Sequence, residues 1–260
     1  MTLLLAEMTW PEVERAVAKG TTTVLLPLGA TEQHGPHLPL GTDTFRAAAL
    51  AAGVAAMPGI LVAPALPFGC SDEHSGFAGL IGVDHATLAQ VIVDCGWRMA
   101  AWGVRRLLLL SAHGGNDQAL ELARSRLHAH ARGLEVVVLP FSGLRALQAI
   151  AAADGISADA VGLHAGDGET SEMLALRPDL ARMERAEAGP SVAMATIMPL
   201  LRQRGVQAAT ASGVLGDPRR ASAGRGAAYL AAEMESFRGD VAGLWEDDGV
   251  RMVGAAERRR

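Results

Sequence analysis

Two histidine-containing loops in this sequence carry side chains that could bind metal ions or transfer protons. The first loop follows residues 21–29 and contains Glu32, His34, His37 and Asp43. Glu32 and His34 stand two residues apart, so on an extended backbone both side chains can lean to one side. Carboxylate and imidazole ligands together suit zinc, manganese or iron. The spacing therefore predicts that this loop contributes to a metal site.

The second loop follows a buried apolar run and contains His113, Gly114, Gly115 and Asn116. Glycines after a strand let the backbone turn sharply and approach a bound group closely. This context favours a functional His113 over a structural one. A third polar cluster, residues 164–171, adds His164 and Glu169.

Several of these residues also have ordinary structural explanations. Glu32 and His34 can be solvated loop residues, and Asp43 can cap the helix that follows it. Glu169 suits the first turn of a helix because of the helix dipole, and His164 can be a loop histidine with satisfied hydrogen bonds. The residues alone leave these alternatives open. The roles of His37 and of His74, in the loop before residue 80, are open as well.

The elements that position these loops alternate between strands and helices. Apolar runs predict strands at 21–29, 60–64, 104–112 and 134–140. Helices are expected at 10–20, 44–57, 84–102 and from the HGGN loop to Arg132, the first of them opened by a capping box. This alternation predicts an α/β fold with a mostly parallel sheet and helices on both faces. Ligands of such sheets bind beyond the carboxyl ends of the strands, where the loops converge.

The last third of the chain is less regular. It predicts helices at 169–177, 194–204 and 219–245 and no strong strand. We therefore expect one domain over residues 1–245 and a C-terminal tail, residues 246–260, whose end frays.

Composition excludes several classes of protein. The chain has 260 residues and a net charge of −5, whereas a nucleic-acid binder would show a basic excess. Lys19 is the single lysine, so a P-loop or Schiff-base enzyme is not expected. Cys70 and Cys95 form no C-x-x-C pair and indicate reduced thiols in a cytoplasm. The first ten residues lack a basic segment, so a signal peptide is not expected. Prolines and glycines interrupt the longest apolar stretch, so a membrane span is not expected either.

Four motifs follow one another along the chain: LGATEQHGPHLPLGTD, SAHGGN, HAGDGETSEML and SGVLGDPRRASAGRG. Together they resemble the signatures of the creatininase family of metal-dependent amidohydrolases, over roughly residues 8–245. The resemblance implies a single three-layer α/β/α domain that hydrolyses C–N bonds. It also implies a site for two divalent metal ions (zinc, iron or manganese) and a homo-oligomer, often a hexamer.

The resemblance implies roles for individual residues. Four residues match the metal ligands of the family: Glu32, His34, Asp43 and His113. Asp43 matches the carboxylate that bridges the two metals. Members that hydrolyse creatinine carry a glutamate two positions after the matching histidine, where this chain has Gly115. In members with an H-G-G-N motif the glutamate of the E-T-S motif takes that place. That residue is Glu169 here, and His164 matches the catalytic histidine.

The loop 68–83 resembles family members that cleave a small modified precursor peptide and release a core derived from its C-terminal Val-Tyr. The alternative substrate is creatinine, or another small cyclic amide or formamide. Gly115 argues against creatinine, as does the absence of tryptophan between Phe141 and His164. A hypothesis of another class is a non-catalytic module for a nucleotide or small anion. No G-x-G-x-x-G or P-loop follows any predicted strand, which argues against it.

Overall fold

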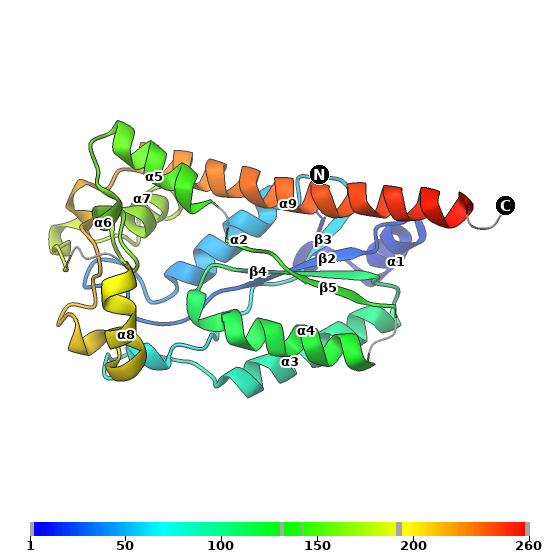
Figure 1. Ribbon diagram of the computed structural model, residues 1–260, viewed down its shortest axis with the longest axis horizontal. Helices are drawn as coiled ribbons and strands as arrows, with labels where there is room; N and C mark the ends of the chain where they lie inside the picture. Colours follow the sequence, from blue (N-terminus) through cyan, green and yellow to red (C-terminus); the bar gives the residue numbers. More distant parts are fainter. Residues whose placement is uncertain (1–2, 131–132, 142, 191–193, 258–260) are drawn as a thin grey trace.

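The computed structural model describes residues 3–130, 133–141, 143–190 and 194–257. Its described residues form a five-stranded parallel sheet with the strand order β1-β3-β2-β4-β5. The strands are β1 (Leu3–Leu4), β2 (Thr23–Leu28), β3 (Ile60–Val62), β4 (Arg106–Ser111) and β5 (Glu135–Val138). The helices are α1 (Trp10–Ala18), α2 (Thr42–Val54), α3 (His85–Ala101), α4 (Asp117–His130), α5 (Leu144–Ala153), α6 (Ala158–Val161), α7 (Asp167–Leu176), α8 (Met194–Arg204) and α9 (Ala223–Glu257). Helices cover both faces of the sheet, as the sequence predicts (Figure 1).

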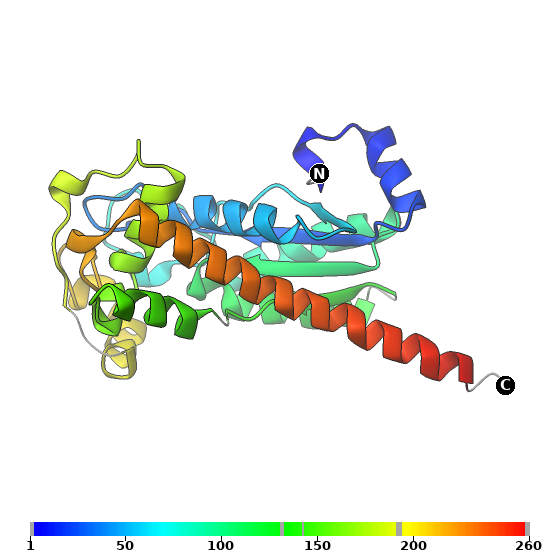
Figure 2. The same ribbon diagram turned by 90° about the horizontal axis from the view of Figure 1, so that it is seen from above.

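Strands β2 and β4 form the middle of the sheet because their side chains are apolar on both faces. Leu26 and Leu107 pack on one face against α3 and α4. Leu25 and Leu108, which are paired in register, pack on the other face against α2 and α9. Successive residues of a strand point to opposite faces, so one apolar run supplies both cores. Figure 2 shows α9 lying across the face that α2 also covers.

A lobe built from α5, α6, α7 and α8 lies beyond the C-terminal ends of the strands, on the left in Figure 1. It has small apolar cores of its own, one of them formed by Leu147, Val161 and Tyr229 of α9. The lobe and the loops after β2 and β4 surround the strand ends. This is the edge of the sheet at which the sequence predicts the site.

Some elements differ from the sequence prediction. β1 has only two residues, too few for a periodic pattern, and α5 and α6 were not predicted. α9 continues to Glu257 rather than ending at 245, because no proline interrupts it after that residue. The predicted end of α4 at Arg132 lies outside the described residues. The division into a domain over 1–245 and a tail stays a prediction.

Helix α2 begins at Thr42, so Asp43 lies inside its first turn and not in the turn before it. The N-cap position is Gly41, and no side chain caps this helix. The capping explanation of Asp43 is therefore wrong. Among the described helices, none combines the length and the apolar character needed to cross a membrane.

Candidate metal centre

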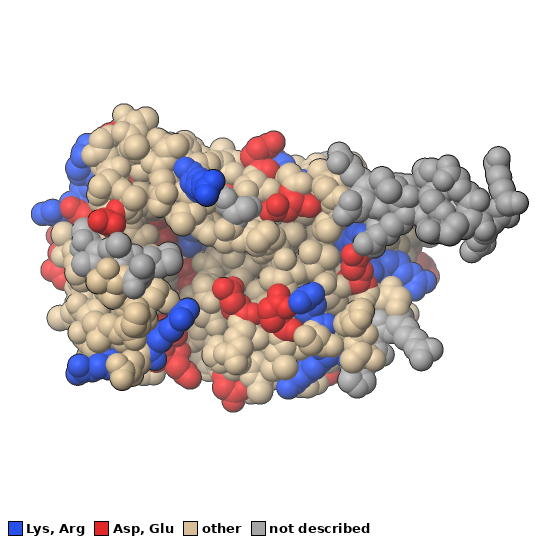
Figure 3. Space-filling model, viewed as in Figure 1, with Lys and Arg blue, Asp and Glu red and all other residues tan. Residues whose placement is uncertain are grey.

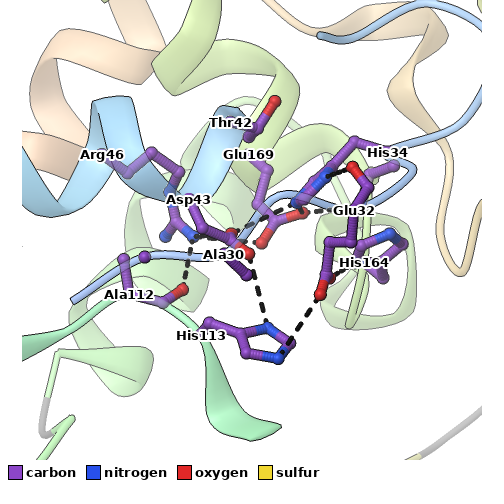
Figure 4. A network of polar contacts seen from close by, with 12 residues as sticks. Ala30, Glu32, His34, Thr42, Asp43, Arg46, Ala112, His113, His164 and Glu169 are labelled. Carbon is purple, nitrogen blue, oxygen red and sulfur yellow. Dashed lines mark hydrogen bonds and ion pairs between the residues drawn. The ribbon is translucent and has the colours of Figure 1, made fainter. Parts of the chain in front are cut away.

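The polar residues that the sequence analysis singled out meet beyond the C-terminal ends of β2 and β4 (Figure 4). Glu32 and His34 come from the loop after β2, Asp43 from the first turn of α2, and His113 from the loop after β4. His164 comes from the loop before α7, and Glu169 from the first turn of α7. β2 and β4 are neighbours and end opposite each other, at Leu28 and Ser111. The loops that follow them therefore start side by side. All of these side chains are buried except that of Glu169, which is 18% exposed.

The ligand-type atoms of the described residues form three groups of three, of which one joins Glu32, His34 and His164 and the other two share Asp43. Of those two, Glu32, Asp43 and His113 make one group, and His34, Asp43 and Glu169 make the other. Asp43 turns one oxygen to each group: Oδ1 lies 3.2 Å from His34 Nε2, and Oδ2 lies 3.4 Å from His113 Nδ1. Glu32 Oε2 lies 3.4 Å from His113 Nε2, and Glu169 Oε2 lies 3.8 Å from His34 Nε2. A carboxylate between two groups of ligands can bridge two cations.

Carboxylate oxygens in this cluster lack hydrogen-bond partners, which fits bound cations. Both oxygens of Glu32 and Oδ2 of Asp43 are buried without a hydrogen bond. Such buried charged atoms are costly unless a counter-charge satisfies them. Burial, and next the charge of Asp43, raise the pKa of Glu32 to about 7. The donor set of carboxylates and imidazoles therefore fits divalent metal ions at this position.

The histidines of the cluster respond to the same carboxylates. Burial lowers the pKa of His34, but the charge and hydrogen bond of Asp43, together with the charges of Glu169 and Glu32, outweigh burial and bring the pKa to about 9. His113 behaves alike, and its pKa is about 10. Without a metal, both nitrogens of each ring thus carry a proton at pH 7, and both imidazoles are positively charged. A metal ion would have to displace these protons to bind the ring nitrogens.

His164 faces the cluster with its unprotonated nitrogen. Its Nε2 lies 2.6 Å from the backbone oxygen of Gln33, so Nε2 donates and carries the proton. Its Nδ1 then points to Glu32, 3.8 Å from Oε1. Burial, and next the nearby His34, lower the pKa of His164 to about 4. At pH 7 this imidazole is neutral and can accept a proton at Nδ1.

His74, whose role the sequence left open, belongs to the wall of the cluster. The Nε2 of Gln33 donates to His74 Nδ1 at 2.9 Å, and the Oε1 of Gln33 accepts from the backbone N–H of Gly35. His74 therefore carries its proton on Nε2, which lies 3.1 Å from Glu32 Oε1. His37, the other open residue, contacts Thr170 at 2.9 Å instead, and its Nδ1 has no hydrogen-bond partner.

The two glycines after His113 differ in their surroundings. A Cβ at Gly114 would meet nothing within 4 Å, whereas a Cβ at Gly115 would lie 2.1 Å from Cys70 O and 2.4 Å from His113 Nε2. Gly115 therefore leaves no empty space. Its missing side chain instead allows the segment around Cys70 to close against His113, and Asn116 holds that segment by accepting from the Cys70 N–H at 2.9 Å.

Glu73 and Arg46 are among the neighbours of the cluster that the sequence does not predict. Glu73 Oε1 lies 3.7 Å from His113 Nε2, and its side chain is 33% exposed. Arg46 lies behind Asp43, one turn further along α2. Its spacing of three residues from Asp43 is the one sequence signal that could have indicated it.

None of the four tryptophans lies near the cluster. Trp10 is on α1, Trp97 on α3, Trp102 at the C-cap of α3, and Trp245 on α9. Trp245 lines a cavity at the opposite edge of the sheet, together with Gly59 and Arg106. Figure 3 shows a hollow in the surface between the lobe and the layer of α3 and α4. The described residues thus provide no tryptophan cage around the cluster.

This chain is similar to known proteins over most of its length. The family described as creatinine amidohydrolase matches residues 6–238. A mycofactocin precursor peptide peptidase of Mycobacterium ulcerans is 38% identical over 213 residues, which are 78% of this chain and 78% of that protein. A creatinine amidohydrolase of Pseudomonas putida is 34% identical over 197 residues, 70% of this chain and 75% of that protein. A crystal structure of creatinine amidohydrolase (creatininase) superposes with a TM-score of 0.77 at 30% identity, covering 94% of this chain and 98% of that chain.

Proposed function

This chain belongs to the creatininase family and is a hydrolase, and from that premise we propose that it is a two-metal peptidase. Its substrate would be a small modified peptide of the kind that the mycofactocin precursor peptide peptidases are named for, cut at a C–N bond near the C-terminus. The observation that carries the proposal is the pair of ligand groups that share Asp43. Asp43 faces a different histidine with each oxygen, as a bridge between two metals requires.

In this proposal, one cation is held by Glu32, Asp43 and His113, and the other by His34, Asp43 and Glu169. Zinc, iron and manganese all accept this set of ligands. When bound, two such ions would polarise the scissile carbonyl and lower the pKa of the attacking water. Glu169 thereby takes the role of the side chain that is missing at Gly115.

His164 is proposed to move the proton. Its Nδ1 is free to accept a proton, while the Gln33 carbonyl holds the ring in place through Nε2. A neutral imidazole that gains a proton during attack can return it to the departing amine. We expect His164→Ala to keep its metals and fold but to lose on the order of 10²- to 10⁴-fold in turnover. Metal analysis and circular dichroism beside the assay separate this result from loss of the site.

The described surroundings of the cluster favour a peptide over creatinine. Gly114 faces open space beside His113, and no tryptophan stands near to enclose a small flat ring. A longer substrate held by remote contacts can use that binding energy to position the scissile amide. We further propose that the protein acts in the cytoplasm as a homo-oligomer, such as a hexamer.

The test is to incubate the metal-loaded protein with a modified precursor peptide that ends in the Val-Tyr core and, separately, with creatinine, and to identify the products by mass. We expect release of the C-terminal core and little or no opening of creatinine. The Asp43→Ala variant, purified in the same way, controls for a contaminating protease. Efficient creatinine opening with an intact peptide would refute the peptidase and support the creatinine hydrolase instead.

A further inference from the structure

Arg46 is a buried cation directly behind the candidate metal centre. It is only 6% exposed, and it lies three positions after Asp43 on α2, so both side chains leave the same face of the helix. Its Nη1 lies 3.8 Å from Asp43 Oδ1. Figure 4 shows the guanidinium beside Asp43.

The guanidinium contacts Glu169 most closely. Nη1 donates to Glu169 Oε1 at 3.0 Å and to the backbone oxygen of Ala112 at 3.3 Å. The other oxygen of Glu169, Oε2, accepts from the backbone N–H of Ala165 at 2.7 Å. Each oxygen therefore receives one hydrogen bond from the protein, and the two bonds together fix the plane of the carboxylate. Held this way, Oε2 faces His34.

Two more carboxylates fix Arg46 from behind. Its Nε donates to Glu172 of α7, and its Nη2 lies 3.6 Å from Glu233 of α9. Both glutamates are completely buried. The planar fork of an arginine can hold several acceptors in one fixed geometry, which a lysine cannot do. Arg46 is thus held by two helices while it holds a residue of the centre.

We infer that Arg46 is a positioning residue that, anchored by Glu172 and Glu233, holds Glu169 toward His34 and Asp43 and so forms the second metal position. This inference rests on the proposed metal centre. The competing explanation is that Arg46 only neutralises Glu172 and Glu233. The two explanations predict opposite effects of removing Arg46. A nearby cation repels metal ions, so charge alone predicts tighter metal binding without it, whereas loss of positioning predicts weaker binding.

The test uses titration of the metal-free protein with Mn²⁺, followed by calorimetry and by the electron paramagnetic resonance of free Mn²⁺. Arg46→Met removes the fork and keeps most of the volume. The triple variant Arg46→Met, Glu172→Gln, Glu233→Gln also removes the carboxylates that would be left without a cation. Arg46→Lys keeps the charge without the fork. Arg106→Met is the matched control, because Arg106 is similarly buried and ion-paired but lies at the opposite edge of the sheet.

We expect the second Mn²⁺ equivalent to bind about 10- to 100-fold more weakly in Arg46→Met and in the triple variant, and the first equivalent to change less. The triple variant should recover thermal stability that Arg46→Met loses, without recovering that affinity, and Arg46→Lys should also bind the second ion more weakly. Arg106→Met should bind both ions as the unchanged protein does. If Arg46→Met does not fold, the triple variant and Arg46→Lys give the answer.

Unchanged or tighter binding of the second Mn²⁺ in the Arg46 variants would overturn the inference, and so would full recovery of that affinity in the triple variant. Either outcome would mean that Arg46 only neutralises the charges of Glu172 and Glu233, and the proposed metal centre would still stand. If the unchanged protein itself binds no second Mn²⁺, the proposed two-metal centre fails and the inference fails with it.

Discussion

The two oxygens of Asp43 face different histidines, one of each proposed metal position. Replacement by alanine should therefore remove both metals, because each position loses a ligand and the remaining cations would repel one another. His34→Ala should mainly empty one position. Elemental analysis of the purified variants measures this directly. A full metal complement in the Asp43 variant would refute the bridge.

The two glycines after His113 should respond differently to the same substitution. A Cβ at Gly115 would collide with Cys70 O and His113 Nε2, while a Cβ at Gly114 would meet nothing. Gly115→Ala should therefore displace His113 and weaken Mn²⁺ binding on the order of 10-fold or more. Gly114→Ala, the same chemical change one residue away, should leave binding unchanged. Equal effects in the two variants would show that close contact at Gly115 does not matter.

At the level of helices, α9 packs against α7, the helix that carries Glu169. A Cβ at Gly226 of α9 would lie 1.8 Å from Ser171 O of α7. Gly226→Ala should force the helices apart and lower the free energy of unfolding by roughly 1–3 kcal/mol. The helix thus approaches α7 at a position that only glycine allows.

Gly239 provides the matched control on the same helix. It is exposed, and a Cβ there would meet nothing within 4 Å. Gly239→Ala should raise the free energy of unfolding by roughly 0.5–1 kcal/mol, because alanine loses less backbone entropy in a helix. Urea denaturation compares the two variants. Similar destabilisation in both would contradict the close approach at Gly226.

At the scale of the whole molecule, metal binding is expected to depend on pH. In the metal-free protein the pKa of His34 is about 9 and that of His113 about 10, so both are protonated at pH 7. Metal ions need the neutral rings and an ionised Glu32, whose pKa is about 7, so binding at pH 7 should release about two protons from the imidazoles and part of a third from Glu32. Apparent affinity then rises with pH until these pKa values are passed, and falls as the pH is lowered.

Titration with Mn²⁺ in weakly buffered solution, with an indicator dye, counts the released protons. The His34→Ala variant should release fewer protons at its remaining position. If the unchanged protein binds Mn²⁺ at pH 7 without releasing protons, the imidazoles are either already neutral or not ligands.

Several features of this protein could be predicted from its sequence because they depend on local patterns. Apolar runs and the loops between them identified β2, β3, β4 and β5 and the edge at which their loops meet. The motifs identified residues that do lie together there, including Glu32, Asp43 and His113. Ligand roles for these residues stay proposals. Short elements without a periodic pattern, such as β1 and α6, could not be predicted in this way.

Only the tertiary structure decided how these residues group and what surrounds them. The division into two groups that share Asp43 depends on where separate loops end in space. The contact of Arg46 with Glu172 joins residues 126 positions apart, and no local pattern predicts such a pair. The sequence does not show that the segment around Cys70 packs against Gly115 and His113, because those residues are distant along the chain. Composition and spacing determine which chemistry is available, whereas the packing of distant segments determines which atoms face each other.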